Sequence, residues 1–152
     1  MITMQRHLSL SISQRTVLVA VDTLRTHLGV DADTILARVD NGEYRWVFDV
    51  SSVRQRRLNS AKHVRELRIW AREVIAPETT SGLSPEGAVR DILGKRDRFY
   101  GTEIAQLLLV SRPQIFRLHE SEELSGEIVG GKLWVSRAVL EKFLLRRLQD
   151  KR

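Results

Sequence analysis

TEIAQLLLVSRPQIFRLHESEELSGEIVGGKLWVSR, residues 102–137, holds two helical patterns followed by two β-prone runs. The first pattern spaces its apolar residues along one helix face, at Ile104, Ala105, Leu107 and Leu108. Ser111 predicts the start of a second helix, because its hydroxyl can accept a hydrogen bond from a free backbone amide. Pro113 is tolerated in the first turn of such a helix. The second helix carries its apolar residues at Ile115, Phe116 and Leu118.

The polar residues of this second helix are expected to point outward: Arg112, Gln114 and Arg117. Two short helices joined by a tight turn form a helix-turn-helix, whose second helix can lie in the major groove of DNA. The runs 127–129 and 132–135 then flank Gly130-Gly131, a pattern typical of a β-hairpin. We expect this hairpin to form a wing beside the two helices.

Further residues complete a longer pattern over 102–144: Ala105, Leu107, Leu108, Val110, Ser111, Ile115, Arg117, Leu118, Ser121, Glu123, Leu124, Gly130, Gly131, Val135, Ser136, Arg137, Leu140, Phe143 and Leu144. With these residues the segment resembles, without a gap, the small winged helix-turn-helix domain of phage and mobile-element excisionases, which is related to the DNA-binding part of MerR-type regulators. Two positions depart from that pattern. Glu122 stands where a glycine commonly ends the second helix, and Ser125 stands where a proline is frequent. We therefore expect the helix to end less sharply.

The resemblance implies binding of double-stranded DNA without catalysis, by a protein that bends DNA or assembles along it. A homodimer or a longer array, and an integrase or recombinase partner, would fit that role. Arg112, Gln114 and Arg117 would meet base edges and phosphates, with Ser111 and Arg137 beside them, and Lys132 of the wing would reach the flanking minor groove or phosphates.

Composition agrees with a nucleic-acid partner. The 152 residues carry a net charge of +6, and most of the 25 lysines and arginines are arginines. Arginine offers a planar fork that matches phosphate and guanine edges, although a genome rich in G and C also raises arginine use. Without cysteine there is neither a disulfide nor a thiolate metal site, and the histidines lack ligand-like spacing, so no cofactor is expected.

No apolar run approaches the roughly 18 residues of a membrane-spanning helix, and MITMQRHLSLSIS at the N-terminus lacks the apolar core of a signal peptide. We expect a cytoplasmic protein with no membrane partner, encoded by a bacterium, phage or plasmid and associated with the nucleoid.

A constant offset of 80 positions aligns the opening pattern with an earlier one, pairing Leu24 with Ile104, Leu28 with Leu108, Val30 with Val110 and Ile35 with Ile115. Trp46-Val47 and Trp134-Val135 follow at a larger offset, which suggests a shorter wing in the first copy. We infer a fold that is mainly α with small β wings, built as two tandem winged helix-turn-helix units. The N-terminal unit would span residues 1–76, a linker 77–83, and the C-terminal DNA-binding domain 84–152.

The first copy differs in its chemistry. Asp31 and Asp33 at the start of its second helix would repel phosphates, so DNA contacts would fall to its basic residues: Arg38, Arg45, Arg54, Arg56 and Arg57. Alternatively, this unit binds protein or supports the fold. Residues 60–75 predict a long amphipathic helix, with Arg65, Arg68 and Arg72 on its polar side. Its apolar stripe would pack in the core or, through Trp70, form a dimer contact.

The motifs of common enzymes are missing: no GxxxxGK[ST] or GxGxxG phosphate loop, no HExxH and no GxSxG. We therefore predict a sequence-specific double-stranded DNA-binding protein of the excisionase type, a directionality or architectural factor of a mobile element, rather than an enzyme. A transcriptional regulator of a mobile element or plasmid is the first alternative. A protein-interaction adaptor, whose basic surface is incidental, is the alternative from another class.

Overall fold

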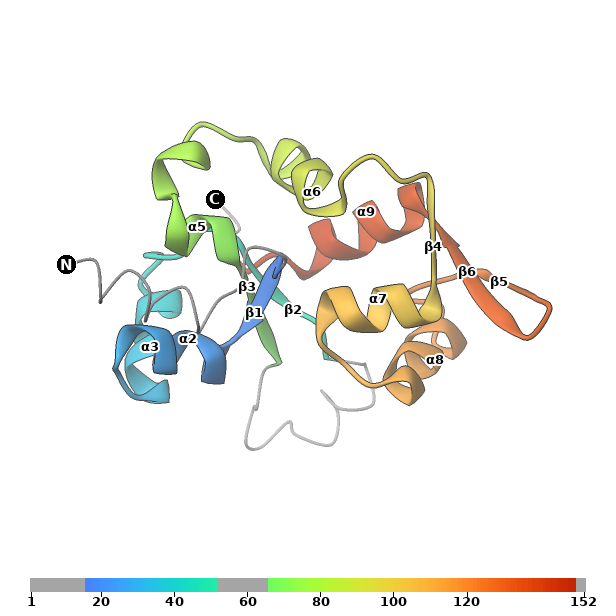
Figure 1. Ribbon diagram of the computed structural model, residues 1–152, viewed down its shortest axis with the longest axis horizontal. Coiled ribbons are helices and arrows are strands. Elements are labelled where there is room, and N and C mark those ends of the chain that lie inside the picture. Colours follow the sequence, from blue (N-terminus) through green and yellow to red (C-terminus); the bar gives the residue numbers. More distant parts are fainter. Residues whose placement is uncertain (1–15, 52–65, 150–152) are drawn as a thin grey trace.

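The computed structural model describes residues 16–51 and 66–149. Arg54, Arg56 and Arg57, proposed above as DNA contacts, lie outside these residues. The described chain is a mixed α/β fold with two three-stranded antiparallel sheets (Figure 1). The expectation of a mainly α fold is thus only partly right, because each hairpin gains a third strand. That strand precedes the first helix of each half, and the one at residues 98–100 had no clear signal in the sequence.

We call residues 18–75 the N-terminal unit and residues 98–147 the C-terminal unit. The N-terminal unit contains β1 (Leu18–Ala20), α2 (Val21–Leu28), α3 (Ala32–Asp40), β2 (Val47–Asp49), β3 (Leu67–Trp70) and α5 (Ala71–Ile75). The C-terminal unit contains β4 (Arg98–Tyr100), α7 (Gly101–Leu108), α8 (Arg112–Glu120), β5 (Glu127–Val129), β6 (Lys132–Ser136) and α9 (Arg137–Arg147). Between the units, in the segment expected to be a linker and just after it, run the 3-10 helix η1 (Pro77–Thr79) and helix α6 (Pro85–Leu93).

Both units follow one order, strand–helix–helix–strand–strand–helix, and both place the third strand in the middle of the sheet, as β1-β3-β2 and β4-β6-β5. The first four elements of the C-terminal unit begin at positions 98, 101, 112 and 127, and their counterparts begin at 18, 21, 32 and 47. The constant offset expected from the sequence therefore recurs in the element boundaries.

The expectation that the two Trp-Val pairs occupy equivalent positions in the two units is wrong. Trp46 immediately precedes β2, the second strand of its unit, whereas Trp134 lies in β6, the third strand of the other. The expectation of a shorter first wing is wrong as well. Residues 50–66 connect β2 with β3, whereas only Gly130-Gly131 separates β5 from β6.

The long amphipathic helix expected over residues 60–75 is also not what forms. Residues 67–70 are the strand β3, helix α5 covers only residues 71–75, and residues 60–65 lie outside the described chain. The central strand β3 pairs with β1 on one side and β2 on the other. Both neighbouring strands form hydrogen bonds with the backbone of β3. This strand pairing outweighs the helical spacing of the apolar residues in the local sequence. Trp70 is 2% exposed, which rules out the dimer contact suggested for it.

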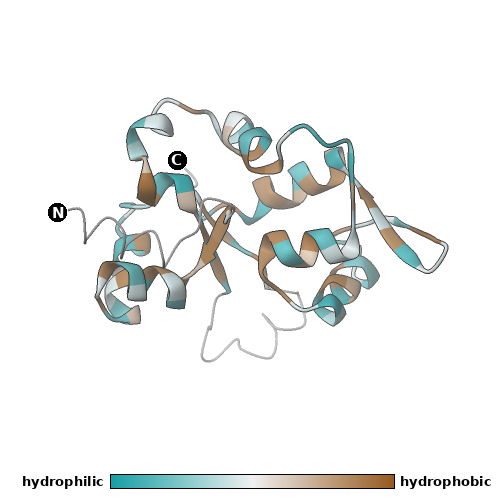
Figure 2. Ribbon diagram, viewed as in Figure 1, coloured by the Kyte–Doolittle hydropathy of each residue, from teal (hydrophilic) through white to brown (hydrophobic). Residues whose placement is uncertain are grey.

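The two units share a core. One buried cluster joins N-terminal residues such as Leu18, Phe48 and Trp70 to C-terminal residues such as Leu108 and Phe143. A second cluster lies within the N-terminal unit, between its sheet and the helices α2 and α3. The first sheet is therefore covered on both faces, one by its own helices and one by the other unit. In Figure 2 the hydrophobic residues of β1 and α9 lie in the middle of the molecule.

Two turns need the left-handed backbone conformation in both units. The N-terminal unit places glycines there, Gly29 with φ 69° and Gly42 with φ 77°. The equivalent residues of the C-terminal unit are Leu109 with φ 57° and Glu122 with φ 64°. Helix α8 ends at Glu120, as α3 ends at Asp40. The blunter helix end expected from Glu122 is therefore not seen, because this residue takes the conformation a glycine would take.

The left-handed turn predicts that Glu122→Gly stabilises the fold by about 0.5–1 kcal/mol. The left-handed conformation costs a residue with a Cβ about 1–2 kcal/mol, and glycine removes this cost. The greater conformational entropy of glycine in the unfolded chain offsets about 0.4–1 kcal/mol of that gain. Glu120→Gly is the matched control: Glu120 is the last helical residue of α8, and its replacement should destabilise by up to about 0.5–1 kcal/mol. Urea unfolding of both variants measures the difference, and effects of the same sign would contradict the turn geometry.

Candidate nucleic-acid interface

Helix α8 begins as the sequence predicts. Ser111 is its N-cap, and the hydroxyl oxygen accepts a hydrogen bond from the amide of Gln114 at 3.2 Å. Pro113 occupies the first turn, where its missing amide has no cost. Ile115 and Leu118 are buried, at 1% and 0% exposure, and hold the helix against the core.

The opposite side of α8 is open to solvent. Arg112 and Arg117 are both exposed, and within the described residues no ion pair engages either guanidinium. They are five positions, about 1.4 turns, apart on a helix of nine residues. The prediction that these two arginines point outward is confirmed.

Gln114 is placed differently from the prediction. Its side chain is 6% exposed, and its Nε2 donates hydrogen bonds to the backbone oxygen of Val50 at 3.3 Å and to Oε2 of Glu66 at 3.1 Å. The expectation that Gln114 faces DNA is therefore wrong. The pattern of α8 alone predicts that a polar residue such as Gln114 faces solvent. In the structure the N-terminal unit covers that side of the helix.

Arg68 of β3 fixes the turn that precedes α8. Its Nε donates to the backbone oxygen of Leu108 at 2.7 Å, and an Nη donates to that of Leu109 at 2.9 Å. These carbonyls end α7 and lack partners within the helix. Burial lowers the pKa of the Arg68 guanidinium, and the nearby Glu66 carboxylate, 3.7 Å away, opposes that shift. Sequence reasoning missed this contact because its partners are remote from Arg68 in the chain.

Arg147, near the end of α9, makes a second link between the units. The residue is 9% exposed, and its guanidinium donates to the backbone oxygens of Asp49 at 3.1 Å and Ser51 at 2.7 Å. It also forms an ion pair with Glu123, in the turn after α8. Gln114 thus ties the start of α8 to the N-terminal unit. Glu123, through its ion pair with Arg147, ties the turn after α8 to the same unit.

Arg137 has a structural task in place of the predicted DNA contact. Its guanidinium donates to the backbone oxygens of Arg90 and Gly94 at the end of α6 and of Arg96 just beyond it. It also donates to Glu141, one turn further along α9, at 2.8 Å. Carbonyls at a helix end need such donors. The side chain therefore ties the start of α9 to the end of α6.

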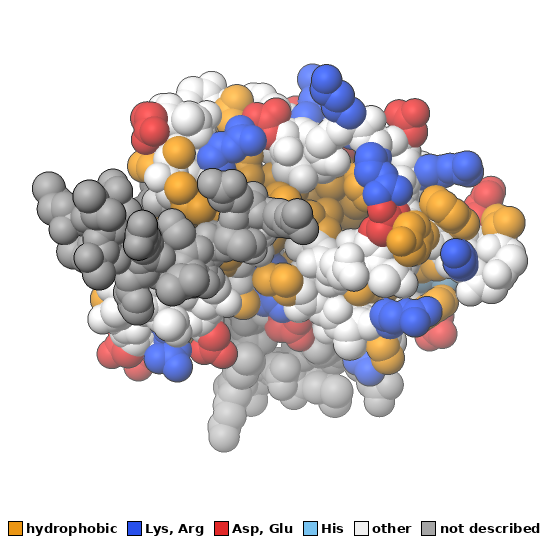
Figure 3. All heavy atoms as spheres, viewed as in Figure 1, with side chains coloured by type: hydrophobic (Ala, Val, Ile, Leu, Met, Phe, Trp, Pro, Cys, Tyr) orange, Lys and Arg blue, Asp and Glu red, His pale blue; other side chains and the backbone are white. Residues whose placement is uncertain are grey.

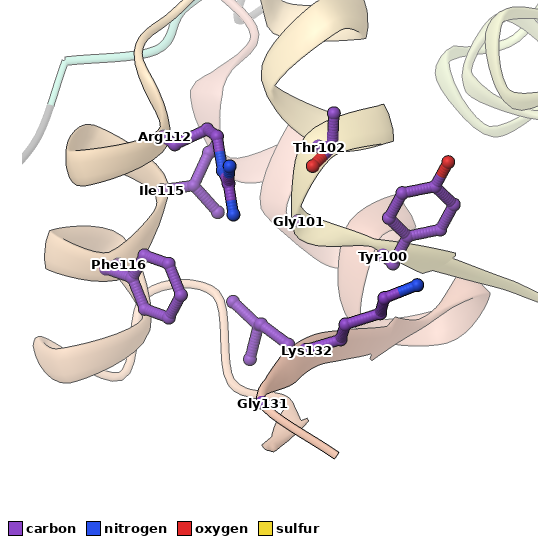
Figure 4. Close-up of a pocket in the computed structure, with 9 residues that line it drawn as sticks. Tyr100, Gly101, Thr102, Arg112, Ile115, Phe116, Gly131 and Lys132 are labelled. Carbon is purple, nitrogen blue, oxygen red and sulfur yellow. The ribbon is translucent and has the colours of Figure 1, made fainter. Parts of the chain in front are cut away.

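A hollow of about 370 Å³ lies beside α8 (Figure 4). Its walls come from the start of α7, from α8 and from β6, and none of its lining residues is acidic: Tyr100, Gly101, Thr102, Arg112, Ile115, Phe116, Gly131, Lys132 and Leu133. In Figure 4, Arg112 extends from α8 and Lys132 from β6 along opposite walls of the hollow, and Thr102 lies at the first turn of α7. The hairpin thus brings an exposed lysine next to the arginine-bearing helix, as the sequence predicts.

The N-terminal unit presents a different surface on the equivalent helix. Ala32 and Ala37 of α3 occupy the positions of Arg112 and Arg117. Three exposed aspartates lie along or beside this helix: Asp31, Asp33 and Asp40. In Figure 3 acidic side chains lie along the lower edge of this unit with a basic one among them, and basic and acidic side chains are interspersed over the half that holds the C-terminal unit.

Arg38 and Arg45, the described members of the basic set predicted to serve the N-terminal unit, make contacts within it. Arg38 donates to the hydroxyl of Tyr44 at 3.3 Å and lies 3.8 Å from Glu43. Arg45 is exposed, and its guanidinium lies 4.6 Å from the centre of the Trp46 ring. Asp31 caps α3, and hydrogen bonds from the hydroxyl and amide of Thr34 lower the pKa of its carboxyl group. The helix α3 therefore carries an acidic surface.

Within residues 16–51 and 66–149, no group of three His, Asp or Glu side chains is arranged as metal ligands. In the same part of the chain, none of the helices combines the length and the apolar character needed to cross a membrane.

The clamp on the α7–α8 turn predicts that Arg68→Met lowers the free energy of unfolding by about 1–3 kcal/mol, because two helix-end carbonyls lose their donors. Arg72→Met is the matched control. Arg72 is exposed and pairs with Asp91 at 3.2 Å, so its loss should cost about 0–1 kcal/mol. Urea unfolding followed by tryptophan fluorescence compares them, and equal losses would argue against the clamp.

Comparison of the chain with protein-family models, with curated proteins and with solved structures finds no match to any of the three. The arrangement of α8, the hairpin and the hollow between them therefore carries the functional argument.

Proposed function

We propose that the protein binds double-stranded DNA sequence-specifically, through a C-terminal winged helix-turn-helix formed by α7, α8 and the β5–β6 hairpin. The observation that carries the proposal is the pair of exposed arginines on α8, Arg112 and Arg117, next to an acid-free hollow that Lys132 also lines. A helix of this kind enters the major groove, while the hairpin reaches the neighbouring backbone.

The chemistry of these groups divides the contacts. Arg117 lies further along the helix, away from the hollow's lining, and can offer a bidentate donor pair to a guanine edge. Arg112, Lys132 and the Thr102 hydroxyl surround the hollow at the first turn of α7. Phosphate oxygens are the natural ligands of such a set, because helix N-termini and cations both favour anions.

The repeated order of elements supports a second winged helix-turn-helix in the N-terminal unit, in tandem with the first. Its α3 has alanines in place of the two arginines and aspartates around them. We therefore assign DNA reading to the C-terminal unit alone. The N-terminal unit acts as a brace that sets the direction of α8 through Arg68, Gln114 and Arg147.

Within DNA-binding proteins, the resemblance of residues 102–144 to excisionases favours a directionality or architectural factor of a mobile element, with an integrase as partner. A plasmid excision assay with the matching integrase tests this narrower role. Unchanged excision, together with altered transcription from a promoter carrying the site, would favour a regulator.

Base and phosphate contacts predict different defects in affinity for a duplex selected from random DNA. Arg117→Ala should reduce the preference for the selected duplex over a scrambled one by about 1–3 kcal/mol. Lys132→Ala should weaken binding to both duplexes alike and reduce the salt dependence by about one phosphate contact. Fluorescence anisotropy at several salt concentrations measures both effects.

Arg25→Ala is the control, since it removes the same charge from α2 of the N-terminal unit, where Arg25 pairs with Asp22 at 3.3 Å. It should leave affinity and specificity nearly unchanged. If Arg117→Ala and Lys132→Ala behave like Arg25→Ala, the assigned DNA surface is wrong. If the unaltered protein binds no duplex even at low salt, the adaptor function is favoured.

A further inference from the structure

The outer face of the C-terminal sheet alternates cationic and aromatic side chains. Arg98 and Tyr100 come from β4, Lys132 and Trp134 come from β6, and the strand register places Tyr100 opposite Trp134. Alternate residues of a strand share one face of the sheet. The intervening side chains turn inward and are buried: Phe99, Leu133 and Val135.

These four residues form a continuous series, which we call the cation–aromatic stripe. Lys132 Nζ lies 5.6 Å from the centre of the Tyr100 ring, the Tyr100 and Trp134 rings are 5.5 Å apart, and Arg98 Cζ lies 5.0 Å from the centre of the Trp134 ring. Both rings are half-buried and both cations are exposed. Among the described residues, no carboxylate pairs with Arg98 or Lys132.

The stripe connects two hollows. Tyr100 and Lys132 belong to the hollow beside α8, and Arg98 and Trp134 line a second one of about 440 Å³, bordered by residues 125–127. Glu127 of β5, opposite Trp134 in the register, is the acidic residue next to the stripe. Phosphates would therefore contact Arg98 of β4 and Lys132 of β6, one on either side of the two rings.

The aromatic rings of the N-terminal sheet, by contrast, are not exposed. Phe48 and Trp70 of the N-terminal sheet, together with the neighbouring Trp46, are buried in the core shared by the two units. Trp46 and Trp70 are 1% and 2% exposed. Trp134 is thus the tryptophan whose ring is partly exposed, with the Arg98 guanidinium over it.

We propose that the cation–aromatic stripe binds single-stranded DNA, with bases stacked on Trp134 and Tyr100 and phosphates held by Arg98 and Lys132. Aromatic platforms flanked by cations bind single strands of any sequence, because every base has a π-face. A stacked base outweighs the cation–aromatic contact of an exposed arginine, so Arg98 can turn from the ring to a phosphate. This activity goes beyond duplex binding and does not require it.

The test uses the full chain and oligothymidylate of about 12 nucleotides, within the length range of single-strand platforms. Binding should quench tryptophan fluorescence, since Trp46 and Trp70 are inaccessible and Trp134 reports the stacking. Trp134→Leu should weaken binding by about 5- to 150-fold, in line with the loss of one stacked base. Trp134→Phe keeps a ring and should stay within about 3-fold of the unaltered protein, with the quenching reduced.

Two further variants keep the proposal testable if Trp134→Leu fails to fold, as judged by circular dichroism. Arg98→Ala changes only an exposed side chain and should weaken binding about 3- to 10-fold, close to the loss of one phosphate contact. Ile128→Ala removes an apolar side chain that is 58% exposed on β5 and should have no effect, because Ile128 pairs with the inward-facing Leu133.

Absence of quenching and of anisotropy change at low salt would overturn the proposal, as would unchanged affinity of both Trp134→Leu and Arg98→Ala. A retained single-strand affinity with no duplex binding would overturn the duplex proposal alone. The reverse result, duplex binding that depends on Arg117 and no binding of oligothymidylate, would overturn only the assignment of the stripe.

Discussion

Polar side chains that cross between the two units hold the proposed reading helix in place. Arg68, Gln114 and Arg147 are buried or largely so, and each donates to backbone oxygens of the opposite unit. A buried guanidinium or amide without partners would cost several kcal/mol, so these contacts are satisfied only when the units sit in one relative position. The exposure of Arg112 and Arg117 on α8 follows from that position.

The two units share an order of elements but differ in what their second helices present. In the N-terminal unit the corresponding positions are alanines, aspartates lie nearby, and glycines occupy both left-handed turns. In the C-terminal unit the helix carries arginines, and Leu109 and Glu122 accept the strained conformation. This difference is the reason that we propose a bracing role for one unit and DNA contact for the other. The same C-terminal unit leaves the outer face of its sheet uncovered, with Trp134 at the surface.

Local pattern was enough to predict much of this arrangement. Residues close to one another in the chain determine the helices α7 and α8, the Ser111 cap and the glycine hairpin. The constant offset between the units is found by comparing two such local patterns. Strand β3 was missed because Leu67 to Trp70 are compatible with either a helix or a strand, and the strands that pair with it, β1 and β2, come from distant parts of the sequence. Gln114 and Arg137 were misplaced because their partners, among them Val50 and Gly94, are equally remote.

The amino-acid sequence alone determined where α8 starts, that this basic helix is followed by a hairpin, and that the order of the first half recurs in the second, because capping, periodicity and turn chemistry act over short distances. Tertiary structure decided which polar residues of α8 remain exposed, which arginines are structural, and that Tyr100 and Trp134 meet on an open face. Those outcomes depend on burial and strand register between segments far apart in the chain, which no local pattern encodes.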